Sequence, residues 1–214
     1  MPSIPFNLLE DPVELASYQG WTEDVYRDLL AVSRDEMSLA EFDAKYMTEH
    51  AILVLDMTGF TETTIHGGAV RSFLRILEAQ QMCMPVFKDT GARLVRAFAD
   101  DLVALYAEPH AALDAAIEIH RRSRVYESPN FSKIGRAECC IGIGYGPVYA
   151  IGPNLAMGDE MNRTSKLGED TARGGETLVT ERAFEVLRTR ADVTFEIQSS
   201  DDLLFEYYQA RAVA

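Results

Sequence analysis

Hydrophobic and polar residues follow two different patterns along this chain, with a change near residue 50. The first twelve positions contain three prolines, and two short helical patterns follow them. Thr22 is a predicted N-cap for the first of these helices, and Ser38 with Glu41 matches a capping box at the start of the second. We therefore predict that residues 1–47 form an N-terminal helical extension.

From residue 50 the pattern alternates between strands and helices. The run 51–56 is continuously apolar and ends in Asp56, as expected for a strand that is buried on both faces and whose polar end emerges at a sheet edge. A helix is predicted next, before Pro85, because apolar residues recur there at helical spacing. These residues are Val70, Phe73, Leu74, Leu77 and Ala79.

The elements predicted after this helix are short and separated by turn residues. In chain order they are a hairpin of strands at 92–98 and 102–106, a helix at 111–126, a pair of strands at 138–144 and 148–151 joined by a Gly-Tyr-Gly-Pro turn, a helix starting at 158–167, a strand at 177–179, a helix capped by Thr180, and strands at 193–197 and 203–208. The order predicts an α+β fold with a ferredoxin-like β-α-β-β-α-β core. We assign residues 48–214 to this domain.

Composition narrows the class of protein. Of the 214 residues, 47% are hydrophobic, which is enough for a packed core and excludes global disorder. Asp and Glu number 34 against 20 Lys and Arg, for a formal charge of −14, so we expect no nucleic acid as partner. A small polyanionic substrate would need a metal ion here. The surplus of acids by itself fits an ordinary solubilising surface as well.

Cysteines and apolar runs indicate the compartment. Cys83, Cys139 and Cys140 show no metal-binding spacing, and we interpret them as buried thiols in a reducing environment. No apolar run reaches the roughly 18 to 20 residues that span a bilayer, and the N-terminus lacks a signal-peptide pattern. We expect a soluble cytoplasmic protein without a membrane partner.

Two acids stand at matching places of the predicted core. Asp56 ends the first strand and Asp100 lies in the hairpin, and these elements are neighbours in a β-α-β-β-α-β sheet. We predict a metal site of Asp56, Met57 and Asp100 that holds two Mg²⁺ or Mn²⁺ ions, with the ions about 3.5–4 Å apart. Gly59, Phe60 and Thr61 follow, and a tight turn there would point amide groups at a phosphate.

Four segments carry a resemblance to a known family. They are 53–61 (LVLDMTGFT), 95–106 (VRAFADDLVALY), 141–146 (IGIGYG) and 158–167 (GDEMNRTSKL). In order and spacing they closely resemble the class III nucleotide cyclase catalytic domain, over about residues 48–190. The resemblance implies a homodimer with active sites at the subunit interface. It also implies conversion of a nucleoside triphosphate to the 3′,5′-cyclic monophosphate, and two divalent metals on Asp56 and Asp100.

The same resemblance assigns two catalytic positions. The family has an Asn and, four residues later, an Arg that steady the ribose and the transition-state phosphate. Asn162 fits the first position, and the second is Lys166. A spacing of four keeps both on one helix face. Lys keeps the positive charge but loses the bidentate fork of Arg. Three alternatives follow: Lys166 acts as a point charge, turnover is slower than in the family, or the neighbouring Arg163 helps.

The residues at the base-reading positions of the resemblance are Arg96 and Leu155. Adenylyl cyclases of this class usually have Lys and Asp or Thr there, and leucine offers no acceptor for an amino group. Arg96 is a donor-only fork that suits base carbonyls, as in uracil or guanine, better than an amino edge. We expect a uridylate cyclase that makes cyclic UMP, similar to the stand-alone pyrimidine cyclases of bacterial Pycsar antiphage systems. An adenylate cyclase, and a degenerate cyclase-like module that only binds nucleotide, are the alternatives.

Overall fold

The structure is a computed structural model that describes residues 7–18, 20–58, 68–98, 100–127, 138–151, 156–200 and 203–213. The chain divides into two compact units. The first comprises Met1–Thr48 with Val148–Met157, and the second comprises Glu49–Pro147 with Gly158–Ala214. The inclusion of Val148–Met157 in the first unit was not part of the sequence prediction.

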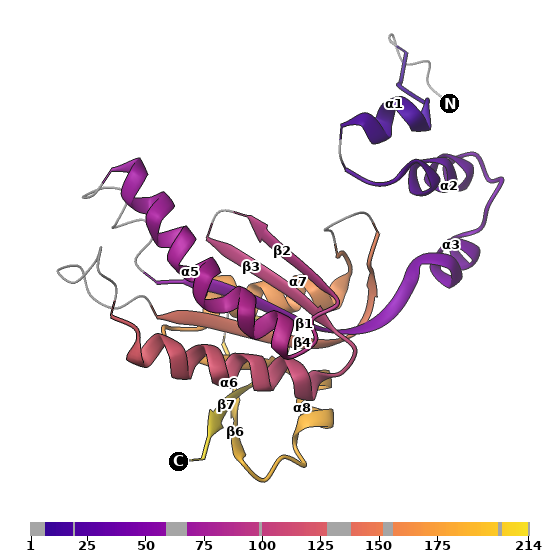
Figure 1. Cartoon of the computed structure of the whole chain (residues 1–214). Helices are drawn as coiled ribbons and strands as arrows, with labels where there is room; N and C mark the ends of the chain where they lie inside the picture. Colours follow the sequence, from indigo (N-terminus) through magenta and orange to yellow (C-terminus); the bar gives the residue numbers. More distant parts are fainter. Residues whose placement is uncertain are drawn as a thin grey trace. The chain divides into compact units, whose positions relative to one another are not determined.

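The first unit contains three helices, α1 (Pro12–Ser17), α2 (Glu23–Ser33) and α3 (Leu39–Tyr46) (Figure 1). Val25, Phe42 and Ile151 form its small hydrophobic core. The capping box is present at α3, where Ser38 and Glu41 bond each other's backbone N–H groups. Thr22 precedes α2 as predicted, although its side chain makes no capping hydrogen bond. The sequence prediction missed α1, which has a proline at its first position, where a missing N–H costs no hydrogen bond.

The described residues of the chain build one seven-stranded sheet in the order β2-β3-β1-β4-β5-β7-β6. Its strands are β1 (Met47–Met57), β2 (Leu94–Phe98), β3 (Asp101–Tyr106), β4 (Cys139–Tyr149), β5 (Thr177–Thr180), β6 (Val193–Gln198) and β7 (Tyr207–Ala212). The first four strands have the order of a ferredoxin-like sheet, which confirms the predicted fold class. The last strand begins later than the sequence predicted.

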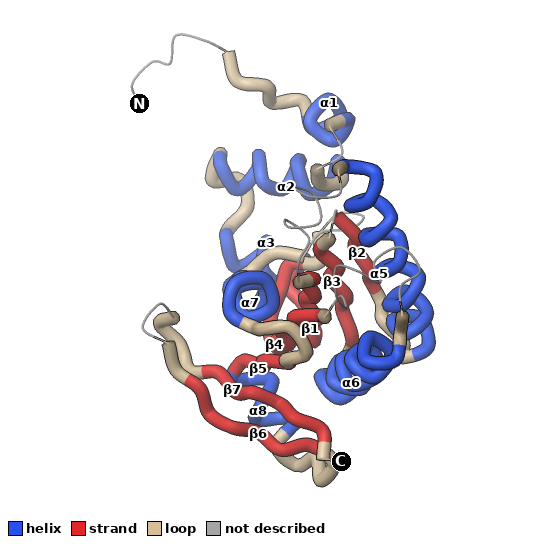
Figure 2. Tube along the Cα trace, turned by 90° about the vertical axis from the view of Figure 1, so that its left-hand side faces the viewer, coloured by secondary structure: helices blue, strands red, loops and turns tan. Residues whose placement is uncertain are grey.

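Three helices cover one face of this sheet, α5 (Ala69–Asp89), α6 (Pro109–Val125) and α8 (Glu181–Leu187). Figure 2 shows α5 and α6 on one side of the strands and α7 (Asp159–Ser165) on the other. Leu53 and Leu55 of β1 point into the core beneath α5 and α6. Because side chains alternate along a strand, Val54 and Asp56 face the side of α7.

Helix α5 differs from its sequence prediction in two ways. It continues through Pro85 to Asp89, since the residues around the proline are buried and hold the chain in place. Its predicted apolar face is also wrong, because Val70, Phe73 and Leu77 are exposed. The side chains that face the core begin polar and become apolar along the helix: Ser72, Arg75, Ala79, Cys83, Val86 and Phe87. The prediction for α6 is confirmed, with Ala112, Ala115, Ala116 and Ile119 fully buried.

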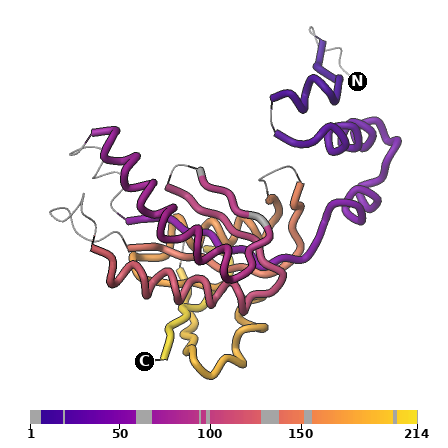
Figure 3. The backbone as a smooth tube through the Cα atoms, in the orientation of Figure 1, coloured from indigo at the N-terminus to yellow at the C-terminus, as the bar shows by residue number. Residues whose placement is uncertain are grey.

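Strand β4 corrects a further prediction. The Gly-Tyr-Gly-Pro segment is not a turn but part of one continuous strand from Cys139 to Tyr149. The path of the chain can be followed in Figure 3. Gly142, Gly144 and Gly146 all lie on the α7 side of the strand. A Cβ on Gly142 would meet the backbone of Thr164 and Gly168, and one on Gly144 or Gly146 would meet side chains. These glycines therefore make room for packing instead of making a turn. No helix within the described residues is long and apolar enough to span a bilayer.

Candidate active site

The end of β1 and the start of β3 bring two carboxylates together. Leu55 pairs with Leu102 in the antiparallel ladder, so the same register places Asp56 beside Asp101. Both leucines point into the helix-covered core. Since side chains alternate, Asp56 and Asp101 lie on the opposite face of the sheet, the face of α7.

Asp100 lies in the hairpin turn directly before Asp101, as predicted. We call Asp56, Asp100 and Asp101 the acidic cluster; all three are half-buried. The pKa of Asp56 is raised to about 6, mainly by burial and also by the nearby Asp100 and Asp101 carboxylates. The Met57 N–H opposes this rise by donating a 2.6 Å bond to Asp56 Oδ1. Negative charge is therefore concentrated here in a partly desolvated place.

Arg96 and Glu169 extend this charged region. Arg96 pairs with Val103 of β3, two residues from Asp101, and so lies on the same face. Burial raises the pKa of Asp101, and the Arg96 guanidinium lowers it. Glu169 approaches from the segment after α7: burial and the Asp101 carboxylate raise its pKa, and Arg96 lowers it. Arg96 is thus the cation among several carboxylates, with its donors on the α7 side of the sheet.

The residues after Asp56 are described only in part. The Met57 side chain is 3% exposed and packs in the hydrophobic core, so only its backbone carbonyl is available to a metal ion. Gly59, Phe60 and Thr61, the predicted phosphate turn, lie outside the described residues, as does the predicted base-reading Leu155. Thr58 is described, and its N–H donates a 2.9 Å bond to Glu138 O.

Helix α7 lies directly against β4 because glycines leave space for it. A Cβ on Gly142 would lie 2.7 Å from Gly168 N, and one on Gly168 would lie 2.7 Å from Val54 O. Gly158, with φ of +135°, precedes the first residue of α7 and adopts a backbone conformation that favours glycine. The helix continues as a π-helix, η1 (Lys166–Thr171). Such π-turns are rare in proteins, but those that occur are often found at functional sites.

A buried carboxylate secures α7 to the sheet. Glu160 is 5% exposed, and its Oε1 accepts hydrogen bonds from Tyr145 N at 3.0 Å and Thr180 Oγ1 at 2.5 Å. One side chain thereby joins α7 to β4 and β5. These hydrogen bonds on the buried side of α7 fix which of its residues face outward.

Asn162 and Lys166 are both on the exposed side of this helical segment. Lys166 Nζ lies 2.7 Å from Asp170 Oδ2, one turn further along. Arg163 pairs with Asp159 at 2.8 Å and lies over the Phe205 ring, 5.1 Å from its centroid. Arg163 is thus engaged by Asp159 and Phe205, and Lys166 is paired with Asp170 on the same exposed side as Asn162.

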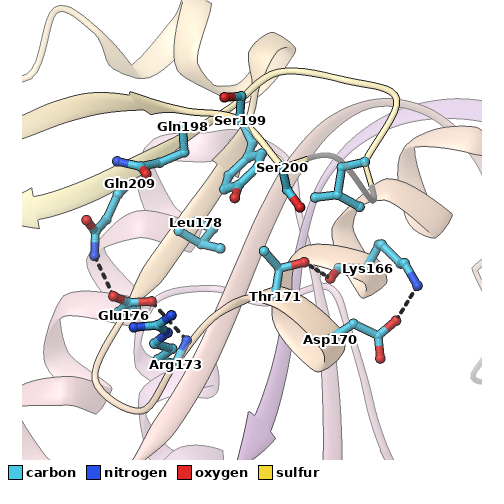
Figure 4. A pocket seen from close by; sticks show the side chains of 12 residues that line it. Lys166, Asp170, Thr171, Arg173, Glu176, Leu178, Gln198, Ser199, Ser200 and Gln209 are labelled. Atoms are coloured by element: carbon cyan, nitrogen blue, oxygen red, sulfur yellow. Dashed lines mark hydrogen bonds and ion pairs between the residues drawn. The ribbon is translucent and has the colours of Figure 1, made fainter.

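Beside Lys166 the second unit has a polar cavity of about 890 Å³. Figure 4 shows the Lys166 side chain turned toward Asp170 at its wall, with Leu178 on its floor. The other lining residues supply hydroxyl, amide and charged groups: Thr171, Arg173, Glu176, Gln198, Ser199, Ser200, Tyr207 and Gln209, together with Leu203. A phosphate-bearing ligand that reached Lys166 would find hydrogen-bond partners here.

Sequence reasoning missed Asp101 and Glu169. Asp101 was detectable, because an antiparallel ladder from a tight hairpin sets the residue opposite Asp56. Glu169 carried no signal, since its place depends on the π-turn. Within the described residues, no three His, Cys, Asp or Glu side chains are arranged to hold one metal ion together.

Comparisons with known proteins identify the fold. No protein-family model and no curated protein sequence matches the chain. The chain is similar to the catalytic core of a rhodopsin-guanylyl cyclase with converted specificity in complex with ATPαS, with a TM-score of 0.66 and 15% identity over 78% of this chain and 98% of that one. A non-canonical dimeric guanylyl cyclase domain from the fungus Blastocladiella emersonii gives a TM-score of 0.63 and 16% identity over 78% of this chain and 97% of that one. The adenylyl cyclase CyaB from P. aeruginosa gives 0.61 and 14% over 78% and 97%.

Its fold is that of class III nucleotide cyclase catalytic domains. The chain covers nearly the whole length of these domains. Within this cyclase fold, the acidic cluster stands at the end of β1, and Asn162 and Lys166 stand on α7 and the first residue of η1.

Proposed function

We propose that this chain is a nucleotide cyclase that converts a nucleoside triphosphate to the 3′,5′-cyclic monophosphate and pyrophosphate. One observation carries the proposal: in a cyclase fold, Asp56 meets the hairpin acids Asp100 and Asp101 at the end of β1, on the side of the sheet opposite α5 and α6. The solved structures that support it include guanylyl and adenylyl cyclases, one of them bound to ATPαS.

The acidic cluster fits divalent metal ions. Its donors are carboxylate oxygens, the ligands that Mg²⁺ and Mn²⁺ prefer. Mg²⁺ is commonly bound by one or two carboxylates together with substrate phosphates, so a protein cage of three ligands is not needed. We assign Asp56 and Asp100 as ligands of two ions, with the Met57 carbonyl beside them. Bound metal would supply a lower pKa for the attacking 3′-hydroxyl and neutralise charge on the leaving pyrophosphate.

The reaction takes place on the nucleotide, which the side chains of this chain position. The ribose 3′-oxygen forms a bond to the α-phosphorus, the bond from that phosphorus to the β-phosphate oxygen breaks, and the hydroxyl proton is released. Asn162 orients the ribose through its amide, and Lys166 places a positive charge at the α-phosphate, where negative charge grows in the transition state. Gly59, Phe60 and Thr61 contribute amide donors to the triphosphate.

The active unit is a homodimer in this proposal, with the acidic cluster of one protomer completed by Asn162 and Lys166 of its partner. The guanylyl cyclase domain from Blastocladiella emersonii, solved as a non-canonical dimer, supports dimerisation of this fold but not this arrangement of the active site.

UTP is the preferred substrate. Arg96 lies on the substrate face and offers only donors, which match the two carbonyl oxygens of uracil better than the amino edge of adenine. Leu155 adds no acceptor for an amino group. Cyclic UMP would serve as a second messenger in bacterial antiphage defence, made in the cytoplasm without nucleic acid as partner. The net charge of −14 is unfavourable for nucleic-acid binding.

One experiment tests the activity and its base preference together. Purified protein is incubated with ATP, GTP, CTP or UTP and Mn²⁺, and the product is identified by mass. Cyclic UMP is the expected main product, and Asp56→Asn removes it, whereas the exposed control Glu185→Gln, which lies in a surface pair with Arg188, leaves it unchanged. Cyclic AMP as main product would establish the adenylate cyclase alternative. Nucleotide binding with no cyclic product would establish the degenerate binding module.

A further inference from the structure

We propose that Arg75 is a positioning residue for the metal end of β1, acting through the backbone at Thr58. The inference rests on the proposed function, because Asp56, two residues before Thr58, is the assigned metal ligand. Arg75 itself touches neither metal nor substrate in this proposal.

Arg75 is a buried cation with a defined backbone contact. It lies on α5 and is 3% exposed. Its Nη2 donates a 2.7 Å hydrogen bond to Thr58 O. A hydrogen bond from a charged donor to a carbonyl is stronger than one from a neutral donor, and burial shields this bond from water.

Thr58 is held from a second side by Glu138, the residue before β4. Thr58 N donates to Glu138 O at 2.9 Å, and Glu138 N donates to Thr58 Oγ1 at 3.2 Å. Gly174 closes a third side, since a Cβ there would lie 2.9 Å from Thr58 Cγ2 and 2.8 Å from Glu138 Cβ. We call Arg75, Thr58, Glu138 and Gly174 the clamp.

The clamp acts on the peptide groups that follow Asp56. Met57 N donates to Asp56 Oδ1 at 2.6 Å, so the direction of the carboxylate depends on the backbone at Met57. The next N–H, of Thr58, is bound by Glu138, and the Thr58 carbonyl is bound by Arg75. Both peptide planes around Thr58 are therefore fixed just before the predicted phosphate turn at 59–61.

Stability alone does not explain a charge at this place. The rest of the buried stripe of α5 becomes apolar at Ala79, Cys83, Val86 and Phe87. A buried guanidinium loses its hydration, and replacing buried charges with well-packed apolar groups is often neutral or stabilising. The charged residue of the stripe, Arg75, occurs where the stripe reaches Thr58. Arg75 therefore serves the orientation of the backbone there.

The test compares Arg75→Met, which removes the charge, and Arg75→Lys, which keeps it without the fork, with a matched control. Arg122 on α6 also donates to a backbone carbonyl, that of Met82 at 3.4 Å, in another part of the core. Arg122→Met is therefore the control. Mn²⁺ binding is measured by electron paramagnetic resonance without nucleotide, and hydrogen exchange is measured by mass spectrometry on all proteins.

We expect Arg75→Met to weaken Mn²⁺ binding by about 10- to 100-fold, as removal of residues that support metal ligands typically does. Exchange should rise in peptides covering 56–62 and 138–141 and remain unchanged in α6 and β3. Arg75→Lys should lie between parent and Arg75→Met, and it decides the matter if Arg75→Met does not fold. Arg122→Met should leave both readouts as in the parent.

Two results would overturn the proposal. One is Mn²⁺ affinity of folded Arg75 variants within twofold of the parent, with unchanged exchange at 56–62. The other is a uniform rise in exchange across α5 and the sheet, which indicates a purely structural role. If the parent binds no Mn²⁺, the proposed metal-dependent function fails, and the exchange at 56–62 alone decides the role of Arg75.

Discussion

Lys166 Nζ lies 2.7 Å from Asp170 Oδ2, within a π-turn that begins at Lys166 itself. The cation assigned to the transition-state phosphate is thus paired with a carboxylate of its own helix. Both side chains are about half exposed, at 50% and 59%, so the pair is weak enough to open when phosphate arrives.

Removal of the competing carboxylate should improve substrate binding. Asp170→Asn removes this ion pair, and since exposed pairs are worth up to about 1 kcal/mol, we expect the KM for the nucleotide to fall by up to about fivefold. Steady-state kinetics with Mn²⁺ measures this. Asp159→Asn, which frees Arg163 from an equivalent pair, is the control and should have no such effect. Equal changes in both variants would contradict the role of Lys166.

The charge and the geometry of Lys166 can be separated by substitution. Lys166→Gln should lower kcat by about 10²–10³-fold, the usual cost of removing one transition-state donor. Lys166→Arg restores the fork and should retain or exceed the parental kcat. A Lys166→Gln enzyme with parental kcat would show that another group carries the phosphate charge.

Asp100 and Asp101 are expected to differ in their effect on metal binding. We expect Asp100→Asn to abolish cyclase activity. Asp101→Asn should weaken Mn²⁺ binding by about tenfold, because Asp101 lies beside Asp56 in the ladder and adds negative charge next to the metal ligands. Calorimetric titration with Mn²⁺ and product analysis test both. Full activity of Asp100→Asn together with an inactive Asp101→Asn would show that Asp101, and not Asp100, is the second metal ligand.

The glycines of β4 should tolerate substitution unequally. Gly142→Ala would place its Cβ 2.7 Å from Gly168 N and against Thr164 O, and we expect a loss of about 1–3 kcal/mol in unfolding free energy, as for other overpacked sites. Gly146→Ala meets only side-chain atoms, the nearest 3.2 Å away, and should cost less. Urea unfolding of both variants compares them. A smaller loss for Gly142→Ala than for Gly146→Ala would argue against the close helix contact.

His120 on α6 should make stability depend on pH. Its ring lies 2.9 Å from Thr177 Oγ1, and burial lowers its pKa from 6.5 to about 4, with Arg124 adding to the decrease. The unfolded state therefore binds more protons between these values, so stability falls as pH decreases from about 6.5 to 4, by on the order of 3 kcal/mol. His120→Gln should show a flatter dependence in thermal melts from pH 4 to 7. Parallel curves would disprove the assignment.

The sequence alone determined the order of elements and suggested the first candidate site residues. Apolar runs with period two or near 3.6 predicted the β-α-β-β-α-β core, and the burial of Ala112, Ala115, Ala116 and Ile119 confirms the face of α6. Asp56 was predictable at a strand end because a single acid ended a buried run. These features depend on residues close together in the chain.

Tertiary structure decided the features that depend on what packs against each element. Helix α5 exposes Phe73 and buries Arg75, because its inner side meets Thr58, a contact that no periodicity encodes. Gly144 lies inside a strand instead of a turn, since the space that it leaves is occupied by α7. The Lys166–Asp170 pair follows from a π-turn packed on β1 through Gly168. Local pattern fixes which residues can form an element, whereas the choice of its buried side depends on partners distant in sequence.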